Sequence, residues 1–220
     1  MDRQLNYATA FWRAMGTAAL VAAGCPGVRA QVSNFHYSGG VGVVALRSTG
    51  PTLVENIGST TYSTYELKTT NTNVLVASAA AGFDAPLLQF GKGEQALGVS
   101  LNASFGLLTT APQEAGGFNG RYLLDFPQYL TYRYGAKASK HSKKDFGVGV
   151  GVGYRFCKFA LPFSAPSAML EGVYSSTGAD WFIRLSTDLR PRRFYNDYSS
   201  EGLVEVLSIR EIQLQVGRSF

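Results

Sequence analysis

His36 and His141 are the two histidines of this 220-residue chain, and histidine is the side chain that most often serves as a general base. His141 is followed at once by Ser142, a potential nucleophile, within a lysine-rich polar segment that predicts a turn. On a strand, two adjacent side chains would point to opposite faces, and the base would not reach the hydroxyl. The sequence therefore predicts that the protein is not an enzyme. His36 is expected to be a satisfied interior or rim residue.

Two further features of the sequence bear on cofactor and metal binding. The segment 40–45 reads Gly-Val-Gly-Val-Val-Ala and fits the GxGxxA form of a dinucleotide-binding fingerprint. That motif requires a helix after its glycines, whereas these glycines stand inside an alternating segment. Cys157 has no cysteine or histidine cluster around it that could bind a metal. We therefore expect no cofactor and no metal site.

The elements that position these residues are indicated by the spacing of apolar side chains. In the segment 146–156, aromatic and valine residues at every second position interleave with glycines. Side chains in a strand alternate between two faces, so one face is a continuous apolar band and the other is nearly bare backbone. Eight segments with this pattern are expected to be strands: 35–47, 73–83, 95–108, 122–135, 146–159, 167–175, 179–190 and 206–220.

These strands predict an all-β fold, an eight-stranded antiparallel up-and-down transmembrane β-barrel with a side-chain-filled lumen. A soluble barrel such as a lipocalin is the less favoured alternative, because it would place its apolar residues inside. With the C-terminus in the periplasm, the predicted turns are 84–94, 139–144 and 176–178. The predicted outer loops are 48–72, 109–121, 160–166 and 191–205, although Tyr62, Tyr65 and Leu67 are consistent with a longer second strand.

Residues 1–30 carry the features of a secretory signal peptide. They have a basic front, an apolar and small-residue centre, and a Val-Arg-Ala end, which leaves a barrel domain of residues 31–220. Cys25 is expected to be removed with that signal, with lipoprotein processing as the alternative. The net charge of +5 and the pI of about 9.2 come without a concentrated basic stripe, so nucleic acid is not expected as a partner.

The segment 124–154 (LDFPQYLTYRYGAKASKHSKKDFGVGVGVGY) and the alternating segment that ends in Phe220 resemble small outer-membrane β-barrels of the OmpA and OmpX type, as found in Bacteroidota. The resemblance covers most of residues 31–220 and implies the outer membrane of a Gram-negative bacterium. It also implies a signal read by the outer-membrane assembly machinery, formed by Ile212, Leu214, Val216 and Phe220. Arg218 departs from that signal and is expected to reach the lipid headgroups.

Some barrels of this class are lipid A deacylases that use histidine, serine and a carboxylate. In those enzymes the histidine and serine are separated by one residue on a strand face, whereas His141 and Ser142 are adjacent. A lipid A-modifying enzyme is therefore kept only as a last alternative.

Charged side chains on the polar faces are expected to form a lumen network of Asp125, Arg155, Glu171, Arg184 and Glu211. A turn centred between positions 177 and 178 would set Glu171 opposite Arg184, and a loop centred between positions 197 and 198 would set Arg184 opposite Glu211. A buried charge without a partner is expensive, so one arginine between two carboxylates is the predicted arrangement.

The remaining concentrated charge is formed by Lys137, Lys140, Lys143 and Lys144, which are expected to lie in a solvated turn. Contact with an acidic periplasmic partner or with lipid headgroups is the alternative.

The predicted role is structural, anchoring or assembly-related, with outer-membrane lipid, lipopolysaccharide and a periplasmic or outer-membrane protein complex as partners. A narrow pore or an adhesin acting through the outer loops is the second candidate, in which Tyr195, Tyr198 and the arginines at 190, 192 and 193 contact a ligand or lipopolysaccharide phosphates.

Overall fold

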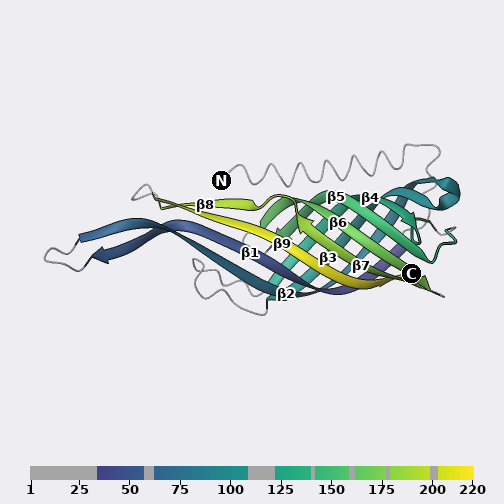
Figure 1. The fold of residues 1–220 in the computed structure, drawn as a ribbon, viewed down its shortest axis with the longest axis horizontal. Helices are drawn as coiled ribbons and strands as arrows, with labels where there is room; N and C mark the ends of the chain where they lie inside the picture. Colours follow the sequence, from purple (N-terminus) through teal and green to yellow (C-terminus); the bar gives the residue numbers. More distant parts are fainter. Residues whose placement is uncertain are drawn as a thin grey trace.

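Eight strands close into a ring in the computed structural model, which describes residues 34–56, 62–108, 122–139, 142–158, 162–176, 179–198 and 203–220 (Figure 1). Neighbours in the ring follow the chain: β1 (Asn34–Asn56), β2 (Tyr62–Phe90), β3 (Gln95–Leu108), β4 (Tyr122–Gly135), β5 (Phe146–Lys158), β6 (Pro162–Ser176), β7 (Ala179–Asp188) and β9 (Leu203–Ser219). β9 returns to pair with β1, and the pairings are antiparallel. The predicted eight-stranded up-and-down barrel is confirmed.

The predicted signal peptide, including Cys25, lies outside the described residues and stays a prediction. Among the residues that are described, no helix is both long and apolar enough to cross a membrane.

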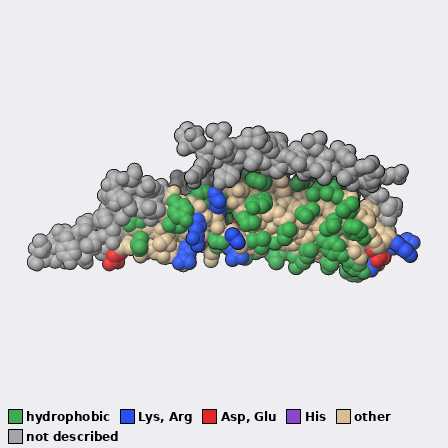
Figure 2. Space-filling view, turned by 90° about the horizontal axis from the view of Figure 1, so that it is seen from above, with side chains coloured by type: hydrophobic (Ala, Val, Ile, Leu, Met, Phe, Trp, Pro, Cys, Tyr) green, Lys and Arg blue, Asp and Glu red, His purple; other side chains and the backbone are tan. Residues whose placement is uncertain are grey.

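Side chains alternate between the lumen and the exterior along the strands. On β5 the exposed fractions of Val148, Val150 and Val152 are 56%, 50% and 59%, whereas Gly149 and Gly151 are buried. Valine, leucine and aromatic side chains of the other strands continue this apolar exterior, which Figure 2 shows in green over the barrel. The glycine face therefore lines the lumen, as predicted from the spacing.

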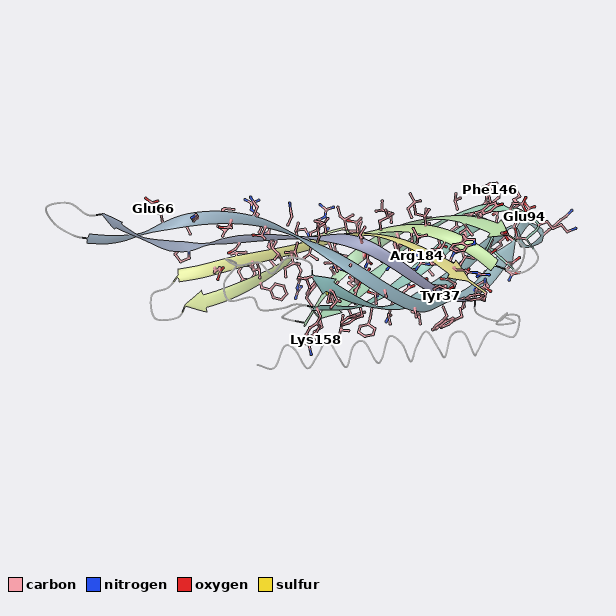
Figure 3. The ribbon with its side chains drawn as sticks, turned by 90° about the horizontal axis from the view of Figure 1, so that it is seen from below. Tyr37, Glu66, Glu94, Phe146, Lys158 and Arg184 are labelled. Atoms are coloured by element: carbon pink, nitrogen blue, oxygen red, sulfur yellow. The ribbon has the colours of Figure 1, made fainter. Side chains whose placement is uncertain are left out.

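Two hairpins extend the sheet beyond one end of the barrel (Figures 1 and 3). β1 and β2 pair without interruption as far as Asn56 and Tyr62, and a short strand, β8 (Arg192–Tyr198), pairs with β9. The predicted outer loops 48–72, 160–166 and 191–205 were therefore wrong over most of their length, because β6 also begins at Pro162. The longer second strand indicated by Tyr62, Tyr65 and Leu67 is confirmed. The segment 68–73 consists of lysine, threonine and asparagine only. It therefore has no alternation of apolar and polar residues to indicate a strand, although the backbone pairing continues through it. We call these two hairpins the surface extension.

The opposite end of the barrel has compact turns. The predicted turn 84–94 was too long, because β2 continues to Phe90 through a register shift between Pro86 and Leu88, and only the 3-10 turn η1 (Gly91–Gly93) and Glu94 lead into β3. After β4 the chain folds back into the barrel mouth: Gly135 has φ +82° and Lys137 φ 63°, and residues 136–139 are buried. β7 also ends at Asp188, two residues earlier than predicted.

β1 and β9 close the ring. Their pairing runs from His36 opposite Ser219 to Thr49 opposite Val206, and the backbone N–H of Phe220 donates to the carbonyl of Phe35 at 3.0 Å. The Arg218 guanidinium carbon lies 5.7 Å from the ring centre of Trp181 and 5.1 Å from that of Phe220. Aromatic and arginine side chains of this kind are typical of the membrane interface.

Candidate functional site in the barrel lumen

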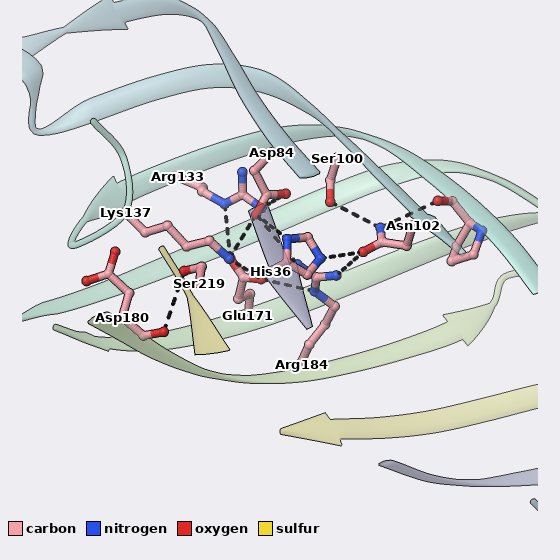
Figure 4. Close-up of polar contacts among 11 residues, drawn as sticks. His36, Asp84, Ser100, Asn102, Arg133, Lys137, Glu171, Asp180, Arg184 and Ser219 are labelled. Carbon is pink, nitrogen blue, oxygen red and sulfur yellow. Dashed lines mark hydrogen bonds and ion pairs between the residues drawn. The ribbon is translucent and has the colours of Figure 1, made fainter. Parts of the chain in front are cut away.

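Five charged side chains meet in the lumen near the compact turns (Figure 4). Each is at least 95% buried, and they come from four strands and from the turn that follows β4: Asp84, Arg133, Lys137, Glu171 and Arg184. We call this group the first charge cluster. The two-residue connection at 177–178 sets Glu171 opposite Arg184, so that predicted pairing is confirmed.

Every carboxylate of the first charge cluster contacts more than one cation. Arg133 bridges the two acids, with Nη2 2.8 Å from Asp84 Oδ1 and Nε 3.0 Å from Glu171 Oε1. Lys137 Nζ lies 2.8 Å from Asp84 Oδ2 and 3.5 Å from Glu171 Oε2. Arg184 Nη2 lies 2.5 Å from Glu171 Oε2. Shared contacts of this kind are what a buried charge needs to offset its desolvation.

Lys137 corrects the prediction of a solvated lysine turn. Its side chain is fully buried, and its ammonium lies 4.3 Å from the centre of the Phe182 ring as well as against the two acids. The left-handed backbone at Lys137 directs the chain into the barrel mouth, which no periodic pattern in the sequence reveals. Asp84 was likewise assigned to a turn and lies instead on β2, facing the lumen.

His36 is a buried lumen residue, as expected, although its Nδ1 contacts Asp84 without a hydrogen bond. Its Nε2 lies 2.7 Å from Asn102 Oδ1, its Nδ1 lies 3.3 Å from Asp84 Oδ2, and its ring is fully buried. Asn102 Oδ1 also accepts a hydrogen bond from Arg184 Nη1 at 2.7 Å. Because Nε2 faces an amide and not a hydroxyl, this Asp84–His36 pair has no serine to activate at that nitrogen.

A second charge cluster lies further along the lumen and consists of Asp125, Arg155, Asp188 and Glu211, each at least 95% buried. Arg155 Nη2 lies 2.7 Å from Asp188 Oδ2, Nη1 contacts Glu211, and Nη1 lies 3.7 Å from Asp125 Oδ2. The backbone N–H of Glu211 also donates to Asp188 at 2.9 Å.

The predicted contact between Arg184 and Glu211 was wrong. Arg184 pairs with Gln215, four residues further along β9, because β7 ends at Asp188 and the chain continues through a break into β8. β8 then pairs with β9 in a register that sets Tyr198 opposite Leu203. Five predicted lumen residues are therefore all buried, but they belong to two clusters instead of one.

Apolar side chains fill the lumen beyond the second charge cluster. Val44 is opposite Glu211 and Leu46 opposite Ile209, which places this layer toward the surface extension. Its buried members are Val44, Leu46, Val74, Val76, Leu123, Cys157, Phe163 and Ile209, with Leu108, Phe194 and Leu207 packed against them. At the other end, a cavity of about 10 Å³ beside Arg133 and Lys137 has room for about one water molecule.

The remaining predicted site residues lie outside the lumen. Lys140 and His141 are outside the described residues, and Lys143 is exposed. Lys144 Nζ donates to the Tyr134 hydroxyl and lies 3.3 Å from Glu94, and these contacts raise the pKa of Lys144 above its usual range. The predicted assembly-signal residues are all exposed on the outer face of the barrel, with exposed fractions of 41% to 59%: Ile212, Leu214, Val216 and Phe220.

Comparisons with known proteins find similar folds and no sequence relative. No protein-family model and no curated protein matches the chain. Among solved structures, Neisserial surface protein A matches with a TM-score of 0.39 and 11% identity, covering 86% of this chain and 98% of its own. The outer membrane protein OprG from Pseudomonas aeruginosa gives 0.35 and 11%, covering 87% and 97%. The outer membrane protease OmpT from Escherichia coli gives 0.38 and 7%, covering 87% and 99%.

Identities and scores this low say nothing about activity or ligands. The surface of the barrel indicates its location. The ring of eight strands is closed, and its exterior is an apolar band with aromatic residues near the ends. The chain is a transmembrane β-barrel of the bacterial outer membrane. In barrels of this kind the short turns face the periplasm, so the surface extension faces the cell exterior.

Proposed function

We propose that this barrel is a non-conducting, non-enzymatic outer-membrane anchor that holds the surface extension in place for contact with another macromolecule. The observation that carries the proposal is the contrast between a filled lumen and strands that continue as paired hairpins outside the membrane. A pore would need an open path, and an eight-stranded barrel encloses only the space that its side chains fill.

The lumen supports the non-conducting role at three levels. The first charge cluster, the second charge cluster and the apolar layer follow one another along the strands, and their members are buried. An ion that entered would have to break buried ion pairs and then cross a layer whose described side chains are apolar and poorly suited to replace its hydration.

The surface extension supports the display role. Its strands follow the order β2-β1-β9-β8, because Thr49 pairs with both Thr69 and Val206 and Tyr195 pairs with Val206. This four-stranded part spans only Leu46–Thr49 of β1 and Val206–Ile209 of β9, and beyond it the two hairpins continue as separate two-stranded ribbons. At this base each inner strand is hydrogen-bonded on both sides, which makes it firmer than a set of separate loops. Binding residues held on such a rigid support lose less conformational entropy when a partner is bound.

Planar-bilayer recording of the purified barrel tests the non-conducting role. We expect no channel steps from the wild type, and stable steps at neutral pH would overturn the proposal in favour of the narrow pore.

Mass spectrometry of lipid A after expression tests the enzymatic alternative, and we expect an unchanged lipid A profile. A new lipid A species that depends on the barrel would show that it is an enzyme.

Shortening of the long hairpin tests whether the barrel folds independently of the surface extension, as an anchor for it would. Replacing residues 52–66 by Asn-Gly keeps Pro51 opposite Leu67 and supplies a two-residue hairpin turn. We expect the shortened barrel to insert normally and to keep its heat-modifiable gel migration. An epitope tag inserted at the tip of the full-length hairpin should be labelled by antibody on intact cells, and absence of labelling would contradict the assigned orientation.

A further inference from the structure

Three arginines lie together on the outward face of the sheet, where the barrel passes into the surface extension. Arg47 of β1 and Arg193 of β8 both pair with Ser208 of β9, one from each side. Arg210 lies two residues from Ser208 on β9 and therefore faces the same side, one outward row nearer the membrane. All three arginine side chains are exposed.

The strand geometry brings the three side chains within reach of one group. Neighbouring strands are about 4.8 Å apart and each residue adds about 3.3 Å, so the Cα atom of Arg210 lies roughly 8 Å from those of Arg47 and Arg193. The other two Cα atoms are roughly 10 Å apart, with Ser208 between them. Extended arginine side chains can bridge these distances, and their planar donors suit bidentate contacts with phosphate oxygens.

The described residues balance the charge of these arginines only weakly: the carboxylate of Asp188 attracts Arg210 from beyond ion-pair distance. None of the three forms an ion pair with a carboxylate of the described residues, and Arg210 donates only from Nε, to the carbonyl of Asp188 at 3.2 Å. The nearby acids of β9 face the other side of the sheet: Glu205 accepts a hydrogen bond from Ser48 at 2.6 Å, and Glu211 is buried in the lumen.

The apolar band begins directly below the three arginines. In the next outward row toward the membrane, the exposed fractions of Val43, Leu75 and Ile212 are 37%, 56% and 48%. Figure 2 shows lysine and arginine side chains in blue gathered where the green band ends, on the side of the surface extension. A ligand that fits both rows carries an anionic group above hydrocarbon chains.

We propose that Arg47, Arg193 and Arg210 form a binding site for a phosphate of an outer-leaflet glycolipid, whose acyl chains lie against Val43, Leu75 and Ile212. The lipid chains supply the apolar contact, and the three guanidinium groups supply charge-assisted hydrogen bonds. The site lies outside the lumen and depends on the barrel's orientation, not on its proposed anchoring role.

Native mass spectrometry of the purified barrel in mild detergent tests the site, with added bisphosphorylated lipid A as the probe. The test variant is Arg47→Gln, Arg193→Gln and Arg210→Gln together. The control is Lys68→Gln, Lys92→Gln and Lys143→Gln, which removes the same charge from three exposed positions outside this site. Heat-modifiable gel migration verifies that both variants are folded.

We expect the test variant to bind lipid A roughly a thousandfold more weakly than the wild type, since three contacts are lost and each contributes about a factor of ten. The control should bind like the wild type, and dephosphorylated lipid A should bind the wild type as weakly as lipid A binds the test variant. Equal binding by the test variant and the wild type, or an equal loss in the control, would overturn the proposal. Equally tight binding of a deacylated sugar phosphate would also overturn it, because the site would then recognise soluble phosphate.

Discussion

The two charge clusters of the lumen differ in how their charges are balanced. In the first charge cluster, three cations surround two carboxylates, and each carboxylate contacts at least two of them. In the second charge cluster, three carboxylates share one guanidinium, that of Arg155. Within the described residues, both oxygens of Asp125 and one oxygen each of Asp188 and Glu211 have no hydrogen-bond partner. In the first charge cluster this holds for one oxygen, Asp84 Oδ2, which forms an ion pair with Lys137 Nζ at 2.8 Å.

The first charge cluster is therefore a redundant network of ion pairs, whereas every ion pair of the second charge cluster depends on Arg155. Loss of one cation from the first charge cluster leaves two others beside the same acids. Loss of Arg155 leaves three buried carboxylates with no cation of the described residues at ion-pair distance, which is an expensive outcome for buried charges. The lumen therefore has one position where a substitution should be far worse than elsewhere.

Arg155→Met should cause the largest loss of stability, on the order of 5 kcal/mol or more, because methionine fills similar space and supplies no charge. The free energy of unfolding in lipid vesicles, measured by urea titration with tryptophan fluorescence, gives the value. A loss smaller than that of Arg184→Leu would contradict the view that Arg155 alone balances its cluster.

Arg184→Leu should cost less, on the order of 3 kcal/mol, because Arg133 and Lys137 remain in contact with Glu171. Arg192→Leu is the control, since Arg192 is exposed in the surface extension and its loss should change the free energy of unfolding little. The same urea titration compares the two variants, and equal losses would show that Arg184 is not part of a stabilising network.

Gly151→Leu should cost about 1 to 3 kcal/mol by overfilling the layer that separates the clusters. A Cβ atom at Gly151 would lie 2.9 Å from Met169 Cγ and 3.2 Å from Thr131 Cγ2, so both neighbours must move. Val150→Leu, on the lipid face, is the matched control and should be nearly silent. Heat-modifiable gel migration and urea titration check both, and equal losses would mean that the two faces are assigned wrongly.

The alternation of side chains made the barrel and its facing predictable, but only where one face is apolar. The pattern of β5 predicted both the lipid face and the glycine face. In the surface extension, threonine and asparagine occupy both faces, so pairing there left no hydrophobic period to detect.

Register was predictable across the shortest turn and not across the longest one. The two-residue connection at 177–178 left one way to align Glu171 with Arg184. Between β7 and β9, the sequence pattern does not indicate that β7 ends at Asp188. The residue of β9 opposite Arg184 is therefore Gln215 and not Glu211, a difference of four residues. Lys137 was missed for a related reason, because a positive φ angle sends a lysine-rich turn into the lumen.

Asp125→Asn should have the smallest effect of the lumen charge substitutions and separates the two clusters most sharply. Neither oxygen of Asp125 has a hydrogen-bond partner in the described residues, and its ion-pair distance to Arg155 is the longest in the second charge cluster, 3.7 Å. Removal of this negative charge leaves Arg155 to Asp188 and Glu211, so we expect a change within about 1 kcal/mol, or a gain in stability. Asp84→Asn is the control from the first charge cluster, where Arg133 and Lys137 would lose a partner at 2.8 Å, and it should be clearly destabilising. Urea titration gives the free energy of unfolding of both variants. If Asp125→Asn proved as costly as Asp84→Asn, the carboxylate of Asp125 would be required for Arg155, and the second charge cluster would be balanced as tightly as the first.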